Sequence, residues 1–190
     1  LEMAKAAAAS PSGMSAVLGG DREAVLAAIT QAGLVAANDN GGGQIVAAGD
    51  LASLAALAAL APEGSRVRAL QVAGAFHTQF MSPAVPAFGE FAATIATSDP
   101  VVGVLSNRDG EILNSGREVI DHIVSQVANP VRWDLCMATM QASGVTRALE
   151  VAPAGTLVGL LKRAVESIEG YAFKSPDDLA AASQFVSSEG

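Results

Sequence analysis

Residues 74–81 read Gly74-Ala75-Phe76-His77-Thr78-Gln79-Phe80-Met81, and this stretch separates two units whose apolar patterns differ. Residues 13–73 alternate between short apolar segments and amphipathic segments, in the predicted order strand, helix, strand, strand, helix, strand. Residues 74–190 alternate helix and strand in the manner of a parallel layer. The sequence therefore predicts an α/β fold with two subdomains that meet near Gly74.

The first unit has the element order of a ferredoxin-like βαββαβ subdomain. We expect its strands at Met14–Leu18, Leu34–Asn38, Gln44–Ala48 and Val67–Val72, and its helices at Arg22–Ala32 and Leu51–Leu60. Three glycines follow Asn40 between two predicted strands, and glycine supplies the positive φ angles that hairpin turns need. A phosphate-binding loop is less favoured, because such loops lead into the N-terminus of a helix.

The second unit is predicted to place its strands between longer helices. Its helices are expected at residues 83–97, 115–127, 133–143, 156–167 and about 176–186, and its strands at residues 101–106, 146–151 and 171–174. The runs Val101-Val102-Gly103-Val104-Leu105 and Ala148-Leu149-Glu150-Val151 are almost continuously apolar. Such runs are typical of strands buried in the middle of a parallel sheet.

Composition limits the class of protein to which the chain can belong. With 190 residues and 51% hydrophobic content the chain can bury a core, and no run of about 18 apolar residues predicts a membrane span. A formal charge of −8 argues against nucleic-acid binding, which depends on a basic face. The single cysteine, Cys136, excludes an internal disulfide and indicates a cytoplasmic protein, and we interpret it as a packing residue.

His77 is the residue whose chemistry is most informative. A histidine titrates near neutral pH, so it can take a proton from a hydroxyl and return it to a leaving group. No serine lies in the Gly-x-Ser-x-Gly pattern of a nucleophile elbow, so the sequence holds only half of a catalytic dyad. Taken alone, His77 would more often be a structural residue. The other histidine, His122, lies in a polar helical segment, and a solvated helix face explains it.

Four ordered motifs carry a family resemblance. They are Asn38-Asp39-Asn40-x-x-x-Gln44-Ile45-Val46-x-x-Gly49, Gly74-Ala75-Phe76-His77-Thr78-x-x-Met81, Gln126-x-x-Asn129-Pro130-Val131-x-Trp133 and Glu150-Val151-x-Pro153-x-x-x-Leu157. Together they resemble the C-terminal two-thirds of a malonyl-CoA:acyl carrier protein transacylase, the malonyltransferase of type II fatty acid synthesis. The resemblance implies that residues 74–190 are the C-terminal part of an α/β-hydrolase-like subdomain, and that residues 1–12 are a helical tail of that same subdomain.

The resemblance also implies the roles of individual residues. His77 would be the catalytic base, and the main-chain carbonyl of Gln126, rather than its side chain, would orient the imidazole. Phe76 would narrow the acyl pocket and favour malonyl over methyl-branched groups, with a plain core role as the alternative. Asn40 would lie near the acyl site, and an asparagine that merely favours a turn is an equally good explanation. No metal is implied.

The function implied is malonyl transfer from coenzyme A to the phosphopantetheine thiol of acyl carrier protein, through an acyl-serine intermediate and without a cofactor. The family's serine elbow and its carboxylate-binding arginine lie in an N-terminal third that has no counterpart here, so we expect the chain to be inactive alone. Two alternatives remain open. One is a non-catalytic module that binds a ligand or docks a carrier protein, and the other is an acyl hydrolase of similar core.

Overall fold

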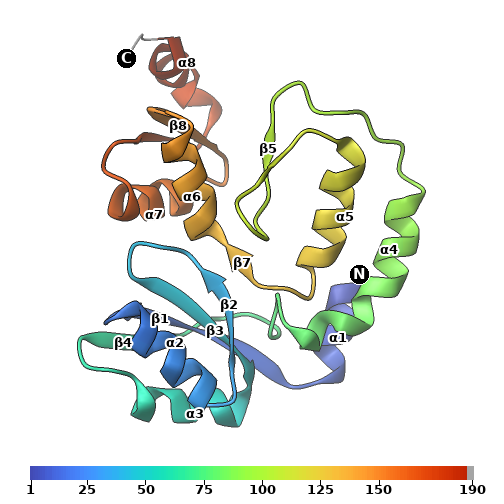
Figure 1. Ribbon diagram of the computed structural model, residues 1–190, viewed down its shortest axis with the longest axis vertical. Helices are drawn as coiled ribbons and strands as arrows, with labels where there is room; N and C mark the ends of the chain where they lie inside the picture. The colour runs from blue at the N-terminus through green and yellow to red at the C-terminus, as the bar shows by residue number, and fades with distance from the viewer. Residues whose placement is uncertain (188–190) are drawn as a thin grey trace.

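The computed structural model describes residues 1–187, which form a mixed α/β structure (Figure 1). A short helix leads into a compact sheet with two helices. The elements are α1 (Glu2–Ala9), β1 (Ser12–Gly19), α2 (Arg22–Gln31), β2 (Val35–Asp39), β3 (Gln44–Asp50), α3 (Leu51–Leu60) and β4 (Ser65–Ala69). The strand and helix order predicted for residues 13–73 is therefore confirmed, with boundaries that differ by a few residues.

The main sheet has the strand order β4-β1-β3-β2, with antiparallel pairing between each of these neighbours. Its two faces are buried against different parts of the chain, because side chains alternate along each strand. One face packs on α2 and α3 (Figure 1), through a helix-side cluster of Val17, Val25, Ile29, Ile45, Ala47 and Leu57. The other face packs on the segment after β4, through a turn-side cluster of Met14, Ala37, Val46, Ala48 and Ala75.

The connection between β2 and β3 is the predicted hairpin. Asn40 N donates to Gln44 O at 3.0 Å, and Gln44 N donates to Gly41 O at 3.0 Å. Gly41, Gly42 and Gly43 have φ angles of 66°, 54° and 74°, which disfavour side chains. A Cβ on Gly41 would also lie 2.6 Å from Met137 Cε, so glycine there permits close approach of the following half.

The second half of the chain adds helices and short strands. They are η1 (Gln79–Ala84), α4 (Val85–Ala93), β5 (Val104–Leu105), β6 (Ile112–Leu113), α5 (Gly116–Gln126), β7 (Val131–Arg132), α6 (Trp133–Ala142), β8 (Arg147–Val151), α7 (Thr156–Ala164), β9 (Glu169–Phe173), η2 (Pro176–Asp178) and α8 (Leu179–Ser187). None of the helices within residues 1–187 combines the length and apolar character that crossing a bilayer requires.

Strand β7 was missing from the sequence-based prediction, and it joins the two halves. It pairs in parallel with β2, with Asn38 opposite Val131 and Asp39 opposite Arg132. The main sheet therefore reads β4-β1-β3-β2-β7 and mixes antiparallel with parallel pairing. Two residues between Pro130 and Trp133 are too few to produce a recognisable strand period, which is why the pattern along the chain did not reveal it.

The apolar run at residues 101–105 does not form the buried parallel strand predicted for it. Only Val104 and Leu105 are extended, and they pair with β6 in an antiparallel hairpin. Val101 and Val102 are 103% and 80% exposed. A strand is buried in a sheet only when neighbours cover it, and within residues 1–187 no strand lies beyond β5 to do so. The run at residues 147–151 does pair in parallel, with β9, but in a sheet of two strands that leaves Leu149 and Val151 exposed, so the buried position predicted for it is also wrong.

Helix α7 begins on the carboxylate of Glu150 rather than on a capping side chain of its own. Glu150 Oε2 accepts from Gly155 N and from Val158 N, each at 2.9 Å, and Oε1 accepts from Leu157 N at 3.0 Å. Burial favours the neutral acid, but the hydrogen bonds from Val158, Leu157 and Gly155 outweigh it and lower the pKa of Glu150. The ionised side chain thus satisfies amides that a helix N-terminus leaves unpaired.

Replacement of this carboxylate should weaken the C-terminal part of the fold. We expect Glu150→Ala to lower the free energy of unfolding by about 1 kcal/mol at pH 7, since solvent screens the partly exposed group. A lowered folded-state pKa contributes stability above the unfolded value of about 4.3, and this is lost as the pH falls through the folded value. Urea unfolding at pH 7 and pH 3 measures this effect. The difference in free energy of unfolding between the Glu150→Ala variant and the original chain should be smaller at pH 3 than at pH 7.

The exposed Glu166 provides the control for this measurement. Glu166→Ala should change the free energy of unfolding by less than about 0.5 kcal/mol at either pH. An equal loss for Glu150→Ala at pH 7 and pH 3 would mean that the ionised carboxylate is not what holds α7.

Candidate functional site

His77 lies in a tight turn between β4 and η1. Ala75 N donates to Ser12 Oγ at 3.1 Å, which ties the turn to β1. Thr78 Oγ1 donates to Ala75 O at 2.6 Å and accepts from Phe80 N at 3.2 Å, so its buried hydroxyl closes the turn and caps η1. The sequence predicted a strand over Val67–Val72, but β4 ends at Ala69, so residues 70–76 separate this strand from His77.

The backbone of His77 is in the left-handed region. Its φ is 60°, and among the residues that the structure describes no other non-glycine residue has a positive φ. This conformation is uncommon for a residue with a Cβ and costs about 1–3 kcal/mol, so it persists only where the surroundings impose it. Here the bonds of Ser12 and Thr78 hold the chain on both sides of His77. The strain sets the direction in which the imidazole projects.

The imidazole of His77 meets the end of α5. Its Nδ1 lies 2.8 Å from Gln126 O. A carbonyl oxygen can only accept, so Nδ1 carries the proton in this bond. The lone pair of the neutral ring is then on Nε2, at the opposite edge. This arrangement is the one that prepares a histidine to act as a base through Nε2.

Phe76 stands next to His77 and contributes to the core. The half-buried ring packs against the turn-side cluster, and also against a second cluster formed by Ala6, Ala7, Met81, Ala84 and Val127. It therefore bridges the sheet, the N-terminal helix and the end of α5. These contacts agree with the core alternative for Phe76.

Asn40 lies in the hairpin and makes no hydrogen bond to His77 within residues 1–187. Its Nδ2 is 3.5 Å from Gln44 Oε1, a weak contact across the turn. The pairing of β2 with β7 nevertheless brings this hairpin beside the segment that follows Gln126. The structure thus joins His77 to Gln126 by a hydrogen bond, whereas Phe76 packs in the neighbouring core and Asn40 is linked to this region only through the sheet.

His122 is more than a solvated helix residue, which corrects the sequence-based interpretation. Its Nδ1 lies 2.8 Å from Ser106 Oγ, and Ser106 is 4% exposed. The Cys136 thiol donates to Ser106 O at 3.3 Å, so three segments meet at this serine. Nothing in the local sequence pattern indicates this contact, because the partners come from a loop and two helices. Burial raises the pKa of the Cys136 thiol to about 11.

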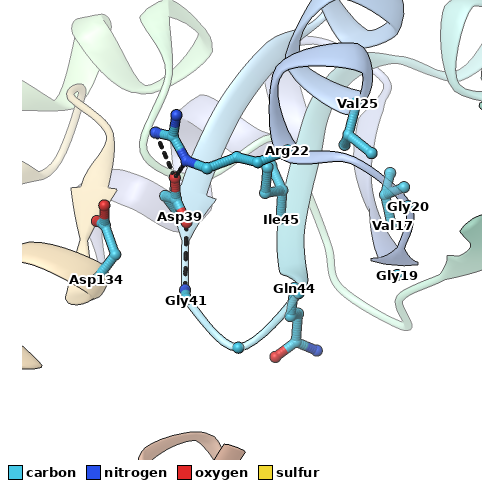
Figure 2. A pocket seen from close by; sticks show the side chains of 12 residues that line it. Val17, Gly19, Gly20, Arg22, Val25, Asp39, Gly41, Gln44, Ile45 and Asp134 are labelled. Atoms are coloured by element: carbon cyan, nitrogen blue, oxygen red, sulfur yellow. Dashed lines mark hydrogen bonds and ion pairs between the residues drawn. The ribbon is translucent and has the colours of Figure 1, made fainter. Parts of the chain in front are cut away.

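A cavity of about 190 Å³ lies at the hairpin, away from these residues (Figure 2). Two of its polar side chains, those of Arg22 and Asp39, are engaged with each other. Arg22 binds the buried Asp39 at 2.8 Å, and Gly41 N donates to Asp39 Oδ1 at 3.2 Å. The hydrogen bond to Asp39 raises the pKa of Arg22, although partial burial opposes it. His77, Phe76 and Gln126 are not among the lining residues.

Within residues 1–187 no group of three or more His, Cys, Asp and Glu side chains could hold a metal ion.

Comparison with known proteins places these features in context. No family model matches the chain. A malonyl CoA-acyl carrier protein transacylase of Mycobacterium tuberculosis is 54% identical over 178 residues, which cover 94% of this chain and 59% of the relative. The chain thus spans about three-fifths of the length of that curated relative.

Solved structures agree with the sequence comparison. The crystal structure of MCAT from Mycobacterium tuberculosis superposes with a TM-score of 0.90 at 54% identity, over 95% of this chain and 60% of that chain. A malonyl-transacylase in complex with its type II PKS acyl-carrier protein superposes with a TM-score of 0.88 at 27% identity, over 95% of this chain and 60% of that chain. The mixed α/β arrangement described above is therefore shared with these proteins.

The buried thiol gives a direct test of the packing around Ser106. We expect the folded chain to react with a disulfide reagent at pH 8 at least about 100-fold more slowly than the unfolded chain, because Cys136 is inaccessible and about one thiol in a thousand is ionised. Absorbance of the released thiolate measures the rate. The chain in guanidinium should react fully, and an equally fast reaction of the folded chain would contradict the buried position.

Proposed function

We propose that this chain belongs to the malonyl-CoA:acyl carrier protein transacylase family and corresponds to the C-terminal part of such an enzyme. In this proposal the chain carries the general base of malonyl transfer. The observation that supports it is the bond from His77 Nδ1 to Gln126 O at 2.8 Å. That bond leaves Nε2 as the basic edge of the imidazole. The two substrates would be malonyl-CoA and the phosphopantetheine thiol of acyl carrier protein.

The proposed reaction has two matching halves. His77 Nε2 takes the proton from a serine hydroxyl as its oxygen attacks the thioester carbonyl, and gives that proton to the departing thiolate of coenzyme A. The product is a malonyl-serine ester. In the second half Nε2 takes the proton of the carrier thiol as the sulfur attacks the malonyl-serine ester, and it returns that proton to the departing serine oxygen. The serine would come from the part of the relatives that this chain does not span.

The Gln126 carbonyl does in this proposal what the aspartate does in a Ser-His-Asp triad. It fixes the ring orientation and keeps the proton on Nδ1. A neutral acceptor stabilises the imidazolium less than a carboxylate would. It also avoids placing a second negative charge near the malonyl carboxylate, which suits an acidic substrate.

We further propose the subdomain division that the motifs imply. Residues 13–73 form a ferredoxin-like subdomain, supported by the strand order β4-β1-β3-β2 and the helices packed on one face. Residues 74–187 form the C-terminal part of an α/β-hydrolase-like subdomain, to which residues 1–12 contribute α1, and the predicted bound at residue 190 lies outside the described residues. Contacts of α1 with η1 and α4 support that last assignment. Asn40 lies on the hairpin that would face the acyl group.

Activity is best tested in a fusion that places the N-terminal part of the Mycobacterium tuberculosis relative before Leu1. We expect this fusion to transfer malonyl groups and His77→Ala to lower kcat about 10³-fold, as loss of the base does in related triads. Radiolabel transferred from malonyl-CoA to acyl carrier protein measures the rate. His122→Ala is the matched control, since His122 bonds Ser106 rather than Gln126.

Each outcome of this assay separates the alternatives. A folded fusion that binds carrier protein but forms no malonyl ester would support the binding module. Release of free malonate without a carrier requirement would support a hydrolase. Full activity of the His77→Ala fusion would refute the assignment of the base.

The ring of Phe76 provides a second test in the same fusion. We expect Phe76→Ser to raise kcat/KM for methylmalonyl-CoA relative to malonyl-CoA by about tenfold. The smaller side chain would leave room for the additional methyl group of methylmalonyl. Phe91→Ser, at a position 63% exposed on α4, is the control and should leave the ratio unchanged. An unchanged ratio for Phe76→Ser would assign the ring to the core alone.

A further inference from the structure

Gln126 is the last residue of α5, and its main-chain carbonyl and its side-chain amide form hydrogen bonds with different segments. Its carbonyl oxygen accepts from His77 Nδ1 at 2.8 Å. Its side-chain Nε2 donates to Asn129 O at 2.7 Å and to Pro130 O at 2.8 Å. The amide thus folds the segment 127–130 back onto the helix end. The family resemblance implies a role only for the carbonyl, and the bonds of the side chain have no role assigned to them.

The carbonyl of Gln126 is free for His77 because the chain offers it no helical donor. The last carbonyls of a helix have no partner within the helix. Val127 N lies 3.4 Å from Val124 O, and Ala128 N lies 3.3 Å from Ser125 O. A continuing helix would bring the N–H of residue 130 to Gln126 O. Residue 130 is a proline and has no N–H.

The main chain alone holds this segment poorly. The bonds of 3.3 and 3.4 Å that close the last turn are long for N–H···O contacts. The short bonds come from side chains, namely those of Gln126 and that from Asn129 Nδ2 to Ser125 O at 2.7 Å. Beyond the segment, Arg132 N is held by Asn107 O at 2.6 Å and β7 is held by β2. Packing of Val127 in the second cluster also holds the end of α5, and the side-chain hydrogen bonds fix the path of the segment that follows it.

We propose that the Gln126 side chain is a positioning residue for His77: by tying Asn129 O and Pro130 O to the helix end, it keeps the Gln126 carbonyl aimed at Nδ1 and so keeps the ring proton on Nδ1. The effect of this side chain on catalysis rests on the proposed function, but its effect on the position of the ring proton does not. Pro130 completes the device by withholding the N–H that would compete for the carbonyl.

Nitrogen NMR of the imidazole tests this on the chain itself. Long-range proton–nitrogen correlations distinguish the two tautomers of a neutral histidine, and the chain has only two histidines. We expect the Nδ1–H form to predominate for His77 and to fall at least about twofold in Gln126→Met, which keeps the bulk of the side chain and removes its donors. His77→Gln assigns the two signals.

His122 and Gln141 provide the controls. His122 lies on α5 itself, so its signal moves if the helix as a whole loosens and stays if only the end is displaced. Gln141→Met makes the same change near the end of α6, where Gln141 Nε2 bonds Ser167 Oγ at 3.2 Å. It should leave His77 unchanged. The amide spectrum of each variant reports whether the chain is folded.

Two further variants keep the proposal testable if Gln126→Met does not fold. Gln126→Glu places an acceptor against two carbonyl oxygens and should also lose the Nδ1–H form. Pro130→Ala, at an exposed position, restores an N–H that can reach Gln126 O and should shift the tautomers in the same direction. Retention of the Nδ1–H form in every folded variant would overturn the proposal.

The active fusion separates this proposal from the proposed function. There we expect Gln126→Met to lower kcat about tenfold with KM for malonyl-CoA unchanged, a much smaller loss than for His77→Ala. If the fusion transfers no malonyl groups, the proposed function fails while the tautomer result stands. If the fusion is active and Gln126→Met alters neither kcat nor the tautomer, the positioning role fails alone.

Discussion

One hydrogen bond, between His77 and the Gln126 carbonyl, links the turn after the main sheet to the end of α5. Its two partners lie 49 residues apart in the chain. His77 lies in a strained turn that is hydrogen-bonded to β1 of the main sheet. Gln126 lies at a helix end whose conformation is stabilised by two amide side chains and a proline. A displacement of either partner would lengthen or break this hydrogen bond of 2.8 Å.

The sequence predicted most of the first unit because its signals are local. Alternating apolar residues and the glycines after Asn40 both act over a few residues. The later strands were predicted less well. Burial of residues 101–105 depends on neighbours that the run itself cannot encode, and β7 is too short to show a period. The parallel pairing of β7 is a property of the tertiary structure alone.

The site was recognised through ordered motifs, not through periodicity. These motifs named His77 and the carbonyl of Gln126, and the structure places the two atoms in contact. They did not reveal the bonds of the Gln126 side chain or the meeting of His122 with Ser106. Such bonds depend on the path of segment 127–130 and on a loop that approaches from elsewhere. A proline four residues after a glutamine is nevertheless visible in the sequence, and it indicates a carbonyl without a helical donor.

The exposed run at residues 101–105 bears on how the chain behaves at high concentration. Val101 and Val102 present apolar surface, yet Pro100 before them lacks an amide hydrogen and Gly103 after them weakens an extended conformation. Proline and glycine in such positions act as gatekeepers against the addition of further strands. The addition of a further strand along this run is therefore disfavoured, although its apolar side chains remain exposed.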